Sequence, residues 1–466
     1  MFELSGVSHV HCIGIGGIGL SAVAEILLSE GYRVSGSDMS ESDTTDRLIE
    51  RGATVYLGHR ARNLGKADLV VYSSAIPMTN PELVEARERG IPVMTRAQML
   101  GRLMSYKADS VAVSGAHGKT TTTAMISLVL KRAGKDPTIL VGGNLSEIAG
   151  NVAVGSSDYF VTEACEYMDS FLSLSPKYAI ILNIDSDHLD YFKGIEHIVR
   201  SFEQFVSQVR DDGAVVAFDA NPFVSGIIEA TDKRVVTFGY NKRCDYSASE
   251  IRFGEDGMPE FSVRYKGETL CRIRLSVPGD HNISNALASF ACCREMGIAS
   301  EEIARTLEGF TGIQRRFDAM GKTFGGVTVI DDYAHHPAEI AATIKAARKV
   351  PHNSLWVIFQ PHTYTRTLAL HDDFAKMLAL ADKVVVAEIY AAREKNVHQI
   401  SAKSIAHKMK EDDPHKDAWF FSSFEEIANF VLNNAEEGDL IITMGAGDVY
   451  KVGEIILEKD REAHLK

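Results

Sequence analysis

One stretch near residue 115 most limits what this chain can fold into. An apolar, β-prone run over residues 111–114 leads into Gly115, Gly118 and Lys119, which four threonines follow. A helical pattern of apolar residues then covers 125–130. A strand, a glycine-rich turn and a helix in this order let backbone N–H groups surround an anion, and the lysine can reach the β- and γ-phosphates of a nucleotide. The stretch therefore predicts an α/β unit that binds a nucleotide such as ATP.

The loop departs from the general phosphate-loop pattern in one respect. That pattern has a glycine five residues before the second one of this loop, and Val113 stands there instead. The strand before the loop and the helix after it supply the context that the shorter motif needs. The Thr120 hydroxyl can then ligate Mg²⁺, although β-branched threonines also make a poor helix start. The predicted ATP contacts in the loop are Gly115, Ala116, His117, Gly118, Lys119, Thr120 and Thr121.

Length and composition limit the partners and the compartment. A chain of 466 residues predicts about three domains. Asp and Glu number 63 against 49 for Lys and Arg, which argues against nucleic acid or an anionic membrane as a partner. The first residues lack a basic leader and no apolar run reaches membrane-spanning length, so we expect no membrane insertion. Six scattered cysteines without metal-type spacing favour a reduced, cytoplasmic protein.

Strand-like apolar runs alternate with helical patterns along the whole chain. This alternation predicts an α/β fold with parallel, doubly wound sheets. Between residues 246 and 277 the pattern becomes hairpin-like, which predicts a small antiparallel edge. We expect a Rossmann-like N-terminal domain, a central α/β domain of the P-loop ATPase type and a Rossmann-like C-terminal domain. Their predicted bounds are 1–106, 107–318 and 319–466.

A second glycine-rich turn follows the first predicted strand. Gly14, Gly16 and Gly19 have the spacing of a dinucleotide-type turn, in which a helix N-terminus faces a pyrophosphate. Asp38 ends the next strand, where an acid can hold a ribose hydroxyl. The two serine hydroxyls in the segment 73–75 either contact the same ligand or cap a helix. A UDP-linked ligand satisfies this chemistry as well as NAD does, and a turn without any ligand is the remaining alternative. The predicted contacts are Gly16, Gly17, Ile18, Gly19, Asp38, Ser73, Ser74 and Ala75.

Acidic residues follow two strands of the central domain. Glu163 is the last residue of an apolar strand that we expect to be buried. A carboxylate at this place beside a phosphate loop can be a second Mg²⁺ ligand. The alternative is a surface acid at the start of a helix. The turn after the next strand contains three aspartates and a histidine. These residues are Asp185, Asp187, His188 and Asp190. Because Mg²⁺ prefers oxygen ligands, chemistry alone favours the aspartates over His188.

Further polar groups lie toward the C-terminal half. Asn282 and Asn285 share one face in the first turns of a predicted helix, where amides suit a nucleobase edge or cap the helix. The paired arginines at 315–316 stand at a domain junction, from which they can reach a phosphate. The loops at 331–337 and 359–367 each follow a strand, at the sheet edge where open α/β sheets bind ligands.

In this order, the motifs resemble those of the Mur ligase family of peptidoglycan synthesis, over essentially the whole chain. The sequences that carry the resemblance are Gly14–Gly19, Gly115–Thr122, His281–Asn285, Arg315–Phe317, Asp331–Pro337 and Gln360–Arg366. The full-length first domain and the last two loops are similar to the branch that adds L-alanine. The resemblance implies a first domain that binds UDP-N-acetylmuramate, a second that binds ATP and Mg²⁺ (or Mn²⁺), and a third that binds the amino acid.

The reaction that the resemblance implies joins L-alanine to the carboxylate of UDP-N-acetylmuramate, with release of ADP and phosphate. A ligase that recycles UDP-N-acetylmuramate with a preformed tripeptide has similar motifs and is the nearest alternative. A nicotinamide-dependent oxidoreductase explains the first glycine turn but leaves Lys119 and Thr120 without a role. The chain is expected to act as a monomer or a homodimer.

The resemblance also implies roles for single residues. Thr120, Glu163 and His188 match the metal ligands of the family, which reverses the preference for the aspartates. Asn282 and Asn285 match adenine contacts, Arg316 and Asp331 match further ATP contacts, and Tyr333, His335 and Arg366 match the amino-acid pocket. The residues expected to take part in catalysis are Lys119, His188, His335 and Arg366.

The chain departs from the family pattern at three places. Ala116 stands where family loops usually carry threonine, which removes one hydroxyl from the phosphate cradle. Thr363 stands where many relatives carry arginine, so a second arginine in the amino-acid pocket is not expected. Other branches use a carbamylated lysine near the metals, and residues 201–209 contain no lysine.

Overall fold

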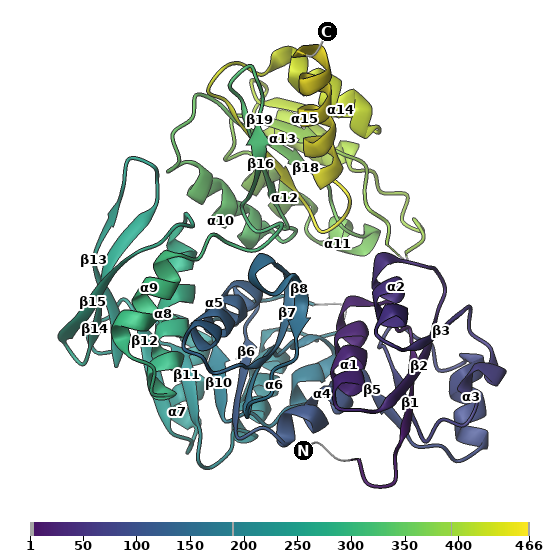
Figure 1. Ribbon diagram of the computed structural model, residues 1–466. Helices are drawn as coiled ribbons and strands as arrows, with labels where there is room; N and C mark the ends of the chain where they lie inside the picture. Colours follow the sequence, from purple (N-terminus) through teal and green to yellow (C-terminus); the bar gives the residue numbers. More distant parts are fainter. Residues whose placement is uncertain (1–3, 189–190, 393, 465–466) are drawn as a thin grey trace. The chain divides into compact units, whose positions relative to one another are not determined.

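A computed structural model describes residues 4–188, 191–392 and 394–464, which form three sheets with flanking helices (Figure 1). The described chain divides into two compact units, each with its own dense packing. The first unit comprises Met1–Ser249, Ser262–Cys271 and Ser284–Leu307. The second unit comprises Glu250–Phe261, Arg272–Ile283 and Glu308–Lys466. The prediction of an α/β fold with three sheets is confirmed.

The first sheet is five-stranded and parallel, with the order β3-β2-β1-β4-β5. Its strands are β1 His9–Ile13, β2 Arg33–Asp38, β3 Thr54–Leu57, β4 Leu69–Tyr72 and β5 Val93–Thr95. Its helices are α1 Ile18–Ser29, α2 Asp43–Glu50, α3 Pro81–Glu88 and α4 Arg96–Ser105, with a short 3-10 turn at Ala61–Leu64. The strand order reverses between β1 and β4, and the glycine turn follows β1. Open α/β sheets bind ligands at such a switch point.

The second sheet has ten strands in the order β15-β14-β13-β12-β11-β10-β6-β9-β7-β8. Its strands are β6 Asp109–Ser114, β7 Thr138–Leu145, β8 Gly150–Ala153, β9 Tyr159–Glu163, β10 Tyr178–Ile181, β11 Ala214–Phe218, β12 Val235–Gly239, β13 Tyr246–Phe253, β14 Pro259–Tyr265 and β15 Glu268–Arg274. Its helices are α5 Lys119–Arg132, α6 Ile195–Ser207, α7 Pro222–Ala230, α8 Asp280–Glu295 and α9 Ser300–Glu308, with 3-10 segments at Ser146–Ile148 and Tyr167–Ser173. The phosphate loop follows β6, which pairs in parallel with β9 and β10.

The third sheet has the order β16-β17-β21-β18-β19-β20 and is parallel except for its antiparallel edge strand β16. Its strands are β16 Asp318–Lys322, β17 Thr328–Asp332, β18 Leu355–Phe359, β19 Lys383–Val386, β20 Asp417–Phe420 and β21 Leu440–Met444. Its helices are α10 Pro337–Ala347, α11 Tyr364–Ala369, α12 His371–Leu378, α13 Lys403–Asp412, α14 Phe424–Asn434 and α15 Tyr450–His464. The last strand, β21, lies between β17 and β18, so the loops after these three strands share one sheet edge.

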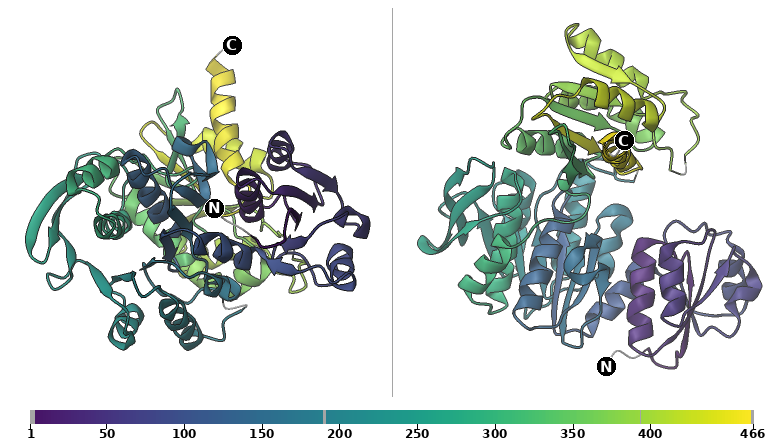
Figure 2. Two further views of the ribbon diagram at one scale, coloured as in Figure 1. Left: turned by 60° about the horizontal axis from the view of Figure 1, so that its bottom comes forward. Right: turned by 45° about the horizontal axis from the view of Figure 1, so that its top comes forward.

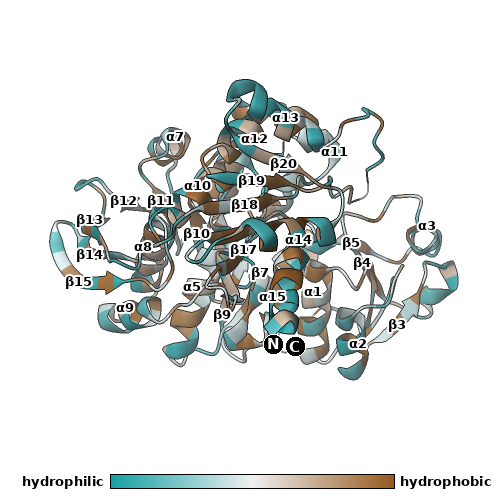
Figure 3. Ribbon diagram, turned by 90° about the horizontal axis from the view of Figure 1, so that it is seen from above, coloured by the Kyte–Doolittle hydropathy of each residue, from teal (hydrophilic) through white to brown (hydrophobic). Residues whose placement is uncertain are grey.

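Helices flank the sheets, which explains why the central strands are apolar along their whole length (Figure 2). All five residues of β1, β18 and β21 are buried. Figure 3 shows this contrast: β18 is coloured as hydrophobic, whereas α2 is largely hydrophilic. Within the described ranges, we find no helix that combines the length and the apolar character needed to span a bilayer.

The sequence pattern predicted the helix after the phosphate loop but missed some other elements. The strands β3, β7, β8, β16 and β20 were not expected, because they are short, exposed or rich in glycine and polar residues. The threonine run after Lys119 does form the start of helix α5, and Thr122 and Thr123 are fully buried there. Tertiary packing therefore outweighs the low helix propensity of these threonines.

Two helical glycines offer a matched test of the packing. A Cβ on Gly101 in α4 would lie 1.9 Å from the carbonyl oxygen of Ser173, whereas a Cβ on Gly226 in α7 would meet no atom within 4 Å. We expect Gly101→Ala to lower the melting temperature of the protein, because the two backbones must separate. Gly226→Ala should raise stability by up to about 1 kcal/mol, because alanine favours the helix. Calorimetric melting of both variants checks this, and an unchanged melting temperature for Gly101→Ala would contradict the packing described.

Candidate active site

The phosphate loop is shaped by two glycines in the left-handed region. Gly115 has φ 136° and Gly118 has φ 87°, values that a side chain disfavours. A Cβ on Gly118 would lie 2.5 Å from Oδ1 of Asn285, so the amide of α8 approaches the loop closely. Asn183, just after β10, accepts a hydrogen bond from the His117 N–H at 2.9 Å and donates one to the His117 carbonyl at 3.0 Å. The loop is therefore held from both sides.

Lys119 lies inside the loop and forms an ion pair. Its ammonium group is 3.1 Å from both carboxylate oxygens of Glu166, and it donates to the carbonyls of Gly115 and Ala116. Burial is the largest single influence and lowers the pKa of Lys119, but the charge and hydrogen bond of Glu166, together with the nearby Cys165 and Glu163, outweigh it and raise that pKa. The lysine therefore stays cationic at neutral pH and can exchange Glu166 for a phosphate oxygen.

The three predicted metal ligands come from neighbouring elements. Glu163 ends β9, aligned with Val113 of β6, and accepts the N–H of Gly142 at 2.5 Å. Thr120 is in the first turn of α5, and His188 packs on the Tyr167 ring with centroids 4.7 Å apart. In the described part of the chain, no three His, Cys, Asp or Glu side chains converge on one point. The oxygen donors still fit Mg²⁺, which usually takes few protein ligands and completes its shell with phosphates and water.

The acids after β10 lie near the loop without forming a cage. Oδ2 of Asp185 is 3.6 Å from Nε2 of His117, and Oδ2 of Asp187 is 3.8 Å from Nε2 of His188. His188 has φ 55°, which places it in a strained turn. Asp190, the third acid of this group, lies outside the described residues.

The N-terminal glycine turn is bound by the acid that the sequence singled out. Asp38 at the end of β2 accepts the Gly16 N–H at 2.9 Å, and a Cβ on Gly16 would lie 3.0 Å from this carboxylate. Helix α1 begins directly after Gly17 and has no side-chain cap, which leaves its first N–H groups directed out of the turn. The hydroxyl of Ser73 accepts the Ala75 N–H at 3.4 Å, and Ser74 is exposed.

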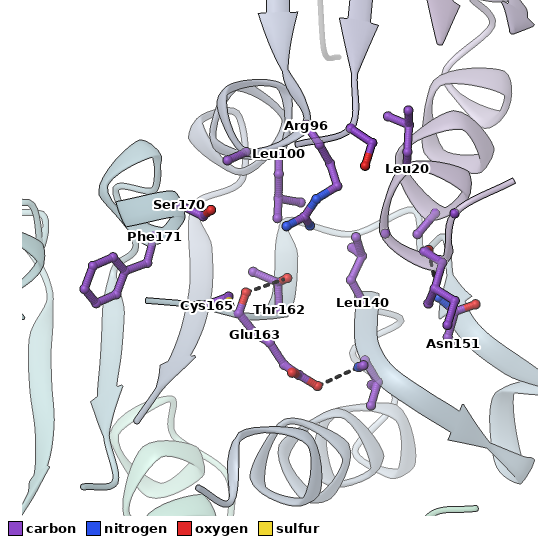
Figure 4. A pocket seen from close by; sticks show the side chains of 18 of the residues that line it. Leu20, Arg96, Leu100, Leu140, Asn151, Thr162, Glu163, Cys165, Ser170 and Phe171 are labelled. Atoms are coloured by element: carbon purple, nitrogen blue, oxygen red, sulfur yellow. Dashed lines mark hydrogen bonds between the residues drawn. The ribbon is translucent and has the colours of Figure 1, made fainter. Parts of the chain in front are cut away.

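A pocket of about 340 Å³ connects the glycine turn to the central strand ends (Figure 4). From the first sheet it is lined by the start of α1 and by Arg96 at the start of α4. From the second sheet it is lined by Gly142, Glu163 and Cys165. A ligand bound at the glycine turn can therefore extend toward the acid beside the phosphate loop.

In the second unit, Arg315 is the arginine that binds Asp331. Its Nε is 3.0 Å from Oδ2 of Asp331, and its Nη2 donates to the carbonyls of Gly445 at 2.8 Å and Gly447 at 2.9 Å. Burial raises the pKa of Asp331, and the ion pair opposes this. Arg316 instead lies over the Tyr333 ring, 5.2 Å from its centroid.

The predicted amino-acid residues lie together after β17 and β18. The rings of Tyr333 and His335 are 5.4 Å apart, and His362 lies 6.2 Å from His335. Burial is the main reason that the pKa values of His335 and His362 are lowered, and the positive charge of Arg366 lowers both further. The pKa of His362 falls to about 4. Both rings are therefore neutral at pH 7.

Three family models match consecutive parts of the chain. They describe the Mur ligase family catalytic domain, matched by residues 9–108, the middle domain, matched by 113–293, and the glutamate ligase domain, matched by 315–447. UDP-N-acetylmuramate–L-alanine ligase of Acetivibrio thermocellus is 50% identical over 455 residues, which are 97% of this chain and 96% of that protein. The chain belongs to the Mur ligase family.

Solved structures of Mur ligases have the same architecture. UDP-N-acetylmuramate-alanine ligase from Thermotoga maritima aligns with a TM-score of 0.82 at 33% identity, over 98% of this chain and 99% of that one. A murein peptide ligase from Psychrobacter arcticus aligns with a TM-score of 0.72 at 25% identity, over 98% and 99% of the two chains. The chain is an ATP-dependent Mur ligase.

Sequence reasoning missed several residues of this Mur ligase site. Glu166 was visible as an acid three residues after Glu163, but its pairing with Lys119 is a contact between residues 47 positions apart that no local pattern indicates. Asn183 could be found only from the pairing of β6 with β10. Asn282 was expected at the adenine, and its amide donates a hydrogen bond to the Pro278 carbonyl at 2.8 Å.

Replacement of the two adjacent arginines should separate a structural role from a ligand role. We expect Arg315→Gln to destabilise the second unit by about 3 kcal/mol, because it leaves Asp331 buried beside Thr443 without its ion pair. Arg316→Gln should change stability by less than about 1 kcal/mol. Calorimetric melting measures both.

The pH dependence of stability checks whether the buried Asp331 causes the destabilisation of Arg315→Gln. Without Arg315 the pKa of Asp331 rises further, so the native state of the variant holds this proton to higher pH than wild type does. The stability deficit of Arg315→Gln should therefore grow as pH rises and shrink as pH falls. Equal deficits at pH 5 and pH 8 would contradict the assignment.

Proposed function

We propose that this chain joins L-alanine to the lactyl carboxylate of UDP-N-acetylmuramate, with conversion of ATP to ADP and phosphate. The observation that carries the proposal is the pocket that leads from the glycine turn to Glu163, beside the loop that holds Lys119. Similarity over nearly the whole chain to ligases of this specificity supports the choice of substrates. The product, UDP-N-acetylmuramoyl-L-alanine, is a precursor of peptidoglycan.

The domain roles follow the three sheets. Residues 1–106 bind UDP-N-acetylmuramate through Gly16–Gly19, Asp38 and the hydroxyl turn at 73–75. Residues 107–318 bind ATP through the loop, Asn282, Asn285 and Arg316, and 319–466 bind L-alanine and supply Asp331. The enzyme acts in the cytoplasm, as a monomer or a homodimer, and needs no nucleic acid or membrane partner.

The chemistry follows from charge. A carboxylate cannot acylate an amine directly, because its leaving group would be oxide. A lactyl oxygen therefore attacks the γ-phosphorus of ATP, the bond to ADP breaks, and an acyl phosphate forms. Lys119 neutralises the charge that develops on the transferred phosphoryl group and is held ready for this by Glu166. The amine of L-alanine then attacks the acyl carbon, and the tetrahedral intermediate expels phosphate.

Thr120, Glu163 and His188 would hold Mg²⁺ (or Mn²⁺) in this site. The ion, when bound, supplies positive charge to the phosphate oxygens. The hydroxyl and the carboxylate are oxygen donors, and His188 packs on the ring of Tyr167, the residue after Glu166. Glu163 also accepts a backbone N–H, which fixes the orientation of its carboxylate.

His335 is suited to remove the proton of the alanine ammonium group. Its Nδ1 is 2.9 Å from the carbonyl of Tyr333, so this nitrogen carries the proton and Nε2 is left as the base. The lowered pKa keeps the ring neutral at pH 7. Arg366 offers a cation for the carboxylate of L-alanine, and the Tyr333 ring lies 5.4 Å from the His335 ring.

The test compares acceptors in a phosphate-release assay with ATP, Mg²⁺ and UDP-N-acetylmuramate. We expect release to be fastest with L-alanine, ahead of glycine, L-serine and D-glutamate, and the amide product to appear by mass spectrometry. Release only with L-Ala-γ-D-Glu-meso-diaminopimelate would assign the chain to the recycling branch instead. Binding of NADH, measured by fluorescence, would favour the oxidoreductase alternative.

Replacement of Lys119 should separate catalysis from sugar-nucleotide binding. We expect Lys119→Ala to abolish turnover, because the charge on the transferred phosphoryl group is no longer neutralised. The dissociation constant for UDP-N-acetylmuramate, measured by calorimetry, should stay within about twofold of wild type. Lys131→Ala, at the exposed end of the same helix, is the control and should keep full turnover. Loss of both turnover and sugar-nucleotide binding in a folded Lys119→Ala protein would refute separate sites.

A further inference from the structure

The pocket between the glycine turn and the central strands contains an arginine that the motifs did not indicate. Arg96 is half-buried at the first position of α4 and lines the pocket together with Gly17, Gly19 and Glu163. Figure 4 shows its guanidinium directed into the pocket, toward the side on which Thr162, Glu163 and Cys165 lie. The side chain therefore faces the space that a ligand would occupy.

The position of Arg96 depends on a glycine of the N-terminal turn. A Cβ on Gly19 would lie 3.0 Å from Cδ, 3.1 Å from Nη1 and 3.2 Å from Nε of Arg96. The guanidinium thus packs directly on the first turn of α1, where a side chain in place of Gly19 would require Arg96 to shift. The third glycine of a dinucleotide-type turn generally serves the close packing of a helix on a strand, and here its missing side chain also makes space for a cation.

The charge of Arg96 has no partner in the part of the chain that the structure describes. No carboxylate there lies within ion-pair distance of its guanidinium, and no hydrogen bond from it is found. Glu163, which shares the pocket, already accepts the Gly142 N–H.

Arg96 does not stabilise helix α4 from its position at the helix start. Helix N-termini carry partial positive charge and favour acids, so a cation at the first position is unfavourable there. The helix is already capped by Thr95 and Gln98, which exchange hydrogen bonds at 3.2 Å and 2.8 Å. An unpaired cation kept at an unfavourable place beside a ligand pocket indicates that an anion completes the site.

We propose that Arg96 is a substrate-binding residue that pairs, through its two-pronged guanidinium, with an oxyanion of the bound UDP-sugar. The inference rests on the proposed function and adds a residue that the motifs leave out. Two oxyanions of the substrate have this chemistry: the diphosphate, which the start of α1 would share, and the lactyl carboxylate, which must pass toward Glu163. Arginine suits both, because its planar fork matches the geometry of phosphate and carboxylate.

The test measures sugar-nucleotide binding by calorimetry with three variants of the full-length protein. Arg96→Gln removes the charge, and Arg96→Lys keeps the charge but loses the fork. Arg102→Gln is the matched control, because Arg102 is an exposed arginine of the same helix that lies over the Tyr106 ring instead. We expect Arg96→Gln to weaken UDP-N-acetylmuramate binding about 10- to 100-fold, Arg96→Lys to weaken it less, and Arg102→Gln to bind within about twofold of wild type.

UDP-N-acetylglucosamine identifies the oxyanion, because it has the same diphosphate but no lactyl carboxylate. An equal loss of affinity for both sugar nucleotides in Arg96→Gln assigns the arginine to the diphosphate. A loss confined to UDP-N-acetylmuramate assigns it to the carboxylate. Either result supports the proposal.

Three results would overturn it, and they can be told apart. Wild-type affinity in Arg96→Gln, beside normal binding by wild type, refutes the role of Arg96 and leaves the proposed function intact. Failure of the wild-type protein to bind UDP-N-acetylmuramate refutes both. A ligand-free melting temperature that falls in Arg96→Gln and is not restored in Arg96→Lys assigns the residue to folding instead. We expect that melting temperature to stay level or rise, because the unpaired cation at the helix start is gone.

Discussion

Parallel pairing of β6 with β9 and β10 is the constraint on which the site depends. It brings the carboxyl ends of three strands to one edge of the second sheet, with the phosphate loop after β6, Glu163 at the end of β9 and Asn183 after β10. Glu166 then pairs with Lys119 inside the loop. The positive charge of Lys119 is thus balanced by a carboxylate of the protein itself. Preorganised charge of this kind needs no rearrangement during the reaction.

The pocket links this edge to the glycine turn of the first sheet. Both ends depend on glycines that leave room for a functional group: Gly118 for Asn285, Gly142 for Glu163, and Gly19 for Arg96. In each case a Cβ would lie 3.0 Å or less from the neighbouring side chain. The glycines therefore do more than permit turns. They set how closely side chains from different elements can approach one another at the site.

The sequence predicted those parts of the site that depend on local conformation. Glycine spacing identified the phosphate loop and the N-terminal turn, because left-handed or tightly packed positions require that residue. The loops with His335 and Arg366 were found because they follow strong apolar strands. The contacts of Arg96 with Gly19 and of Arg315 with Gly445 are long-range, and no local pattern encodes them. The insertion of β21 between β17 and β18 is likewise a choice of topology that the alternation of strands and helices leaves open.

Activation of the lactyl carboxylate by ATP transfers one carboxylate oxygen to the phosphate, and an isotope label detects this transfer. UDP-N-acetylmuramate labelled with ¹⁸O in the lactyl carboxylate is incubated with ATP, Mg²⁺ and L-alanine, and the released phosphate is analysed by ³¹P NMR. One carboxylate oxygen must leave with the phosphoryl group, so we expect an ¹⁸O atom in the released phosphate and an isotope shift of the phosphate signal. Unlabelled phosphate formed together with the amide product would contradict an acyl-phosphate route.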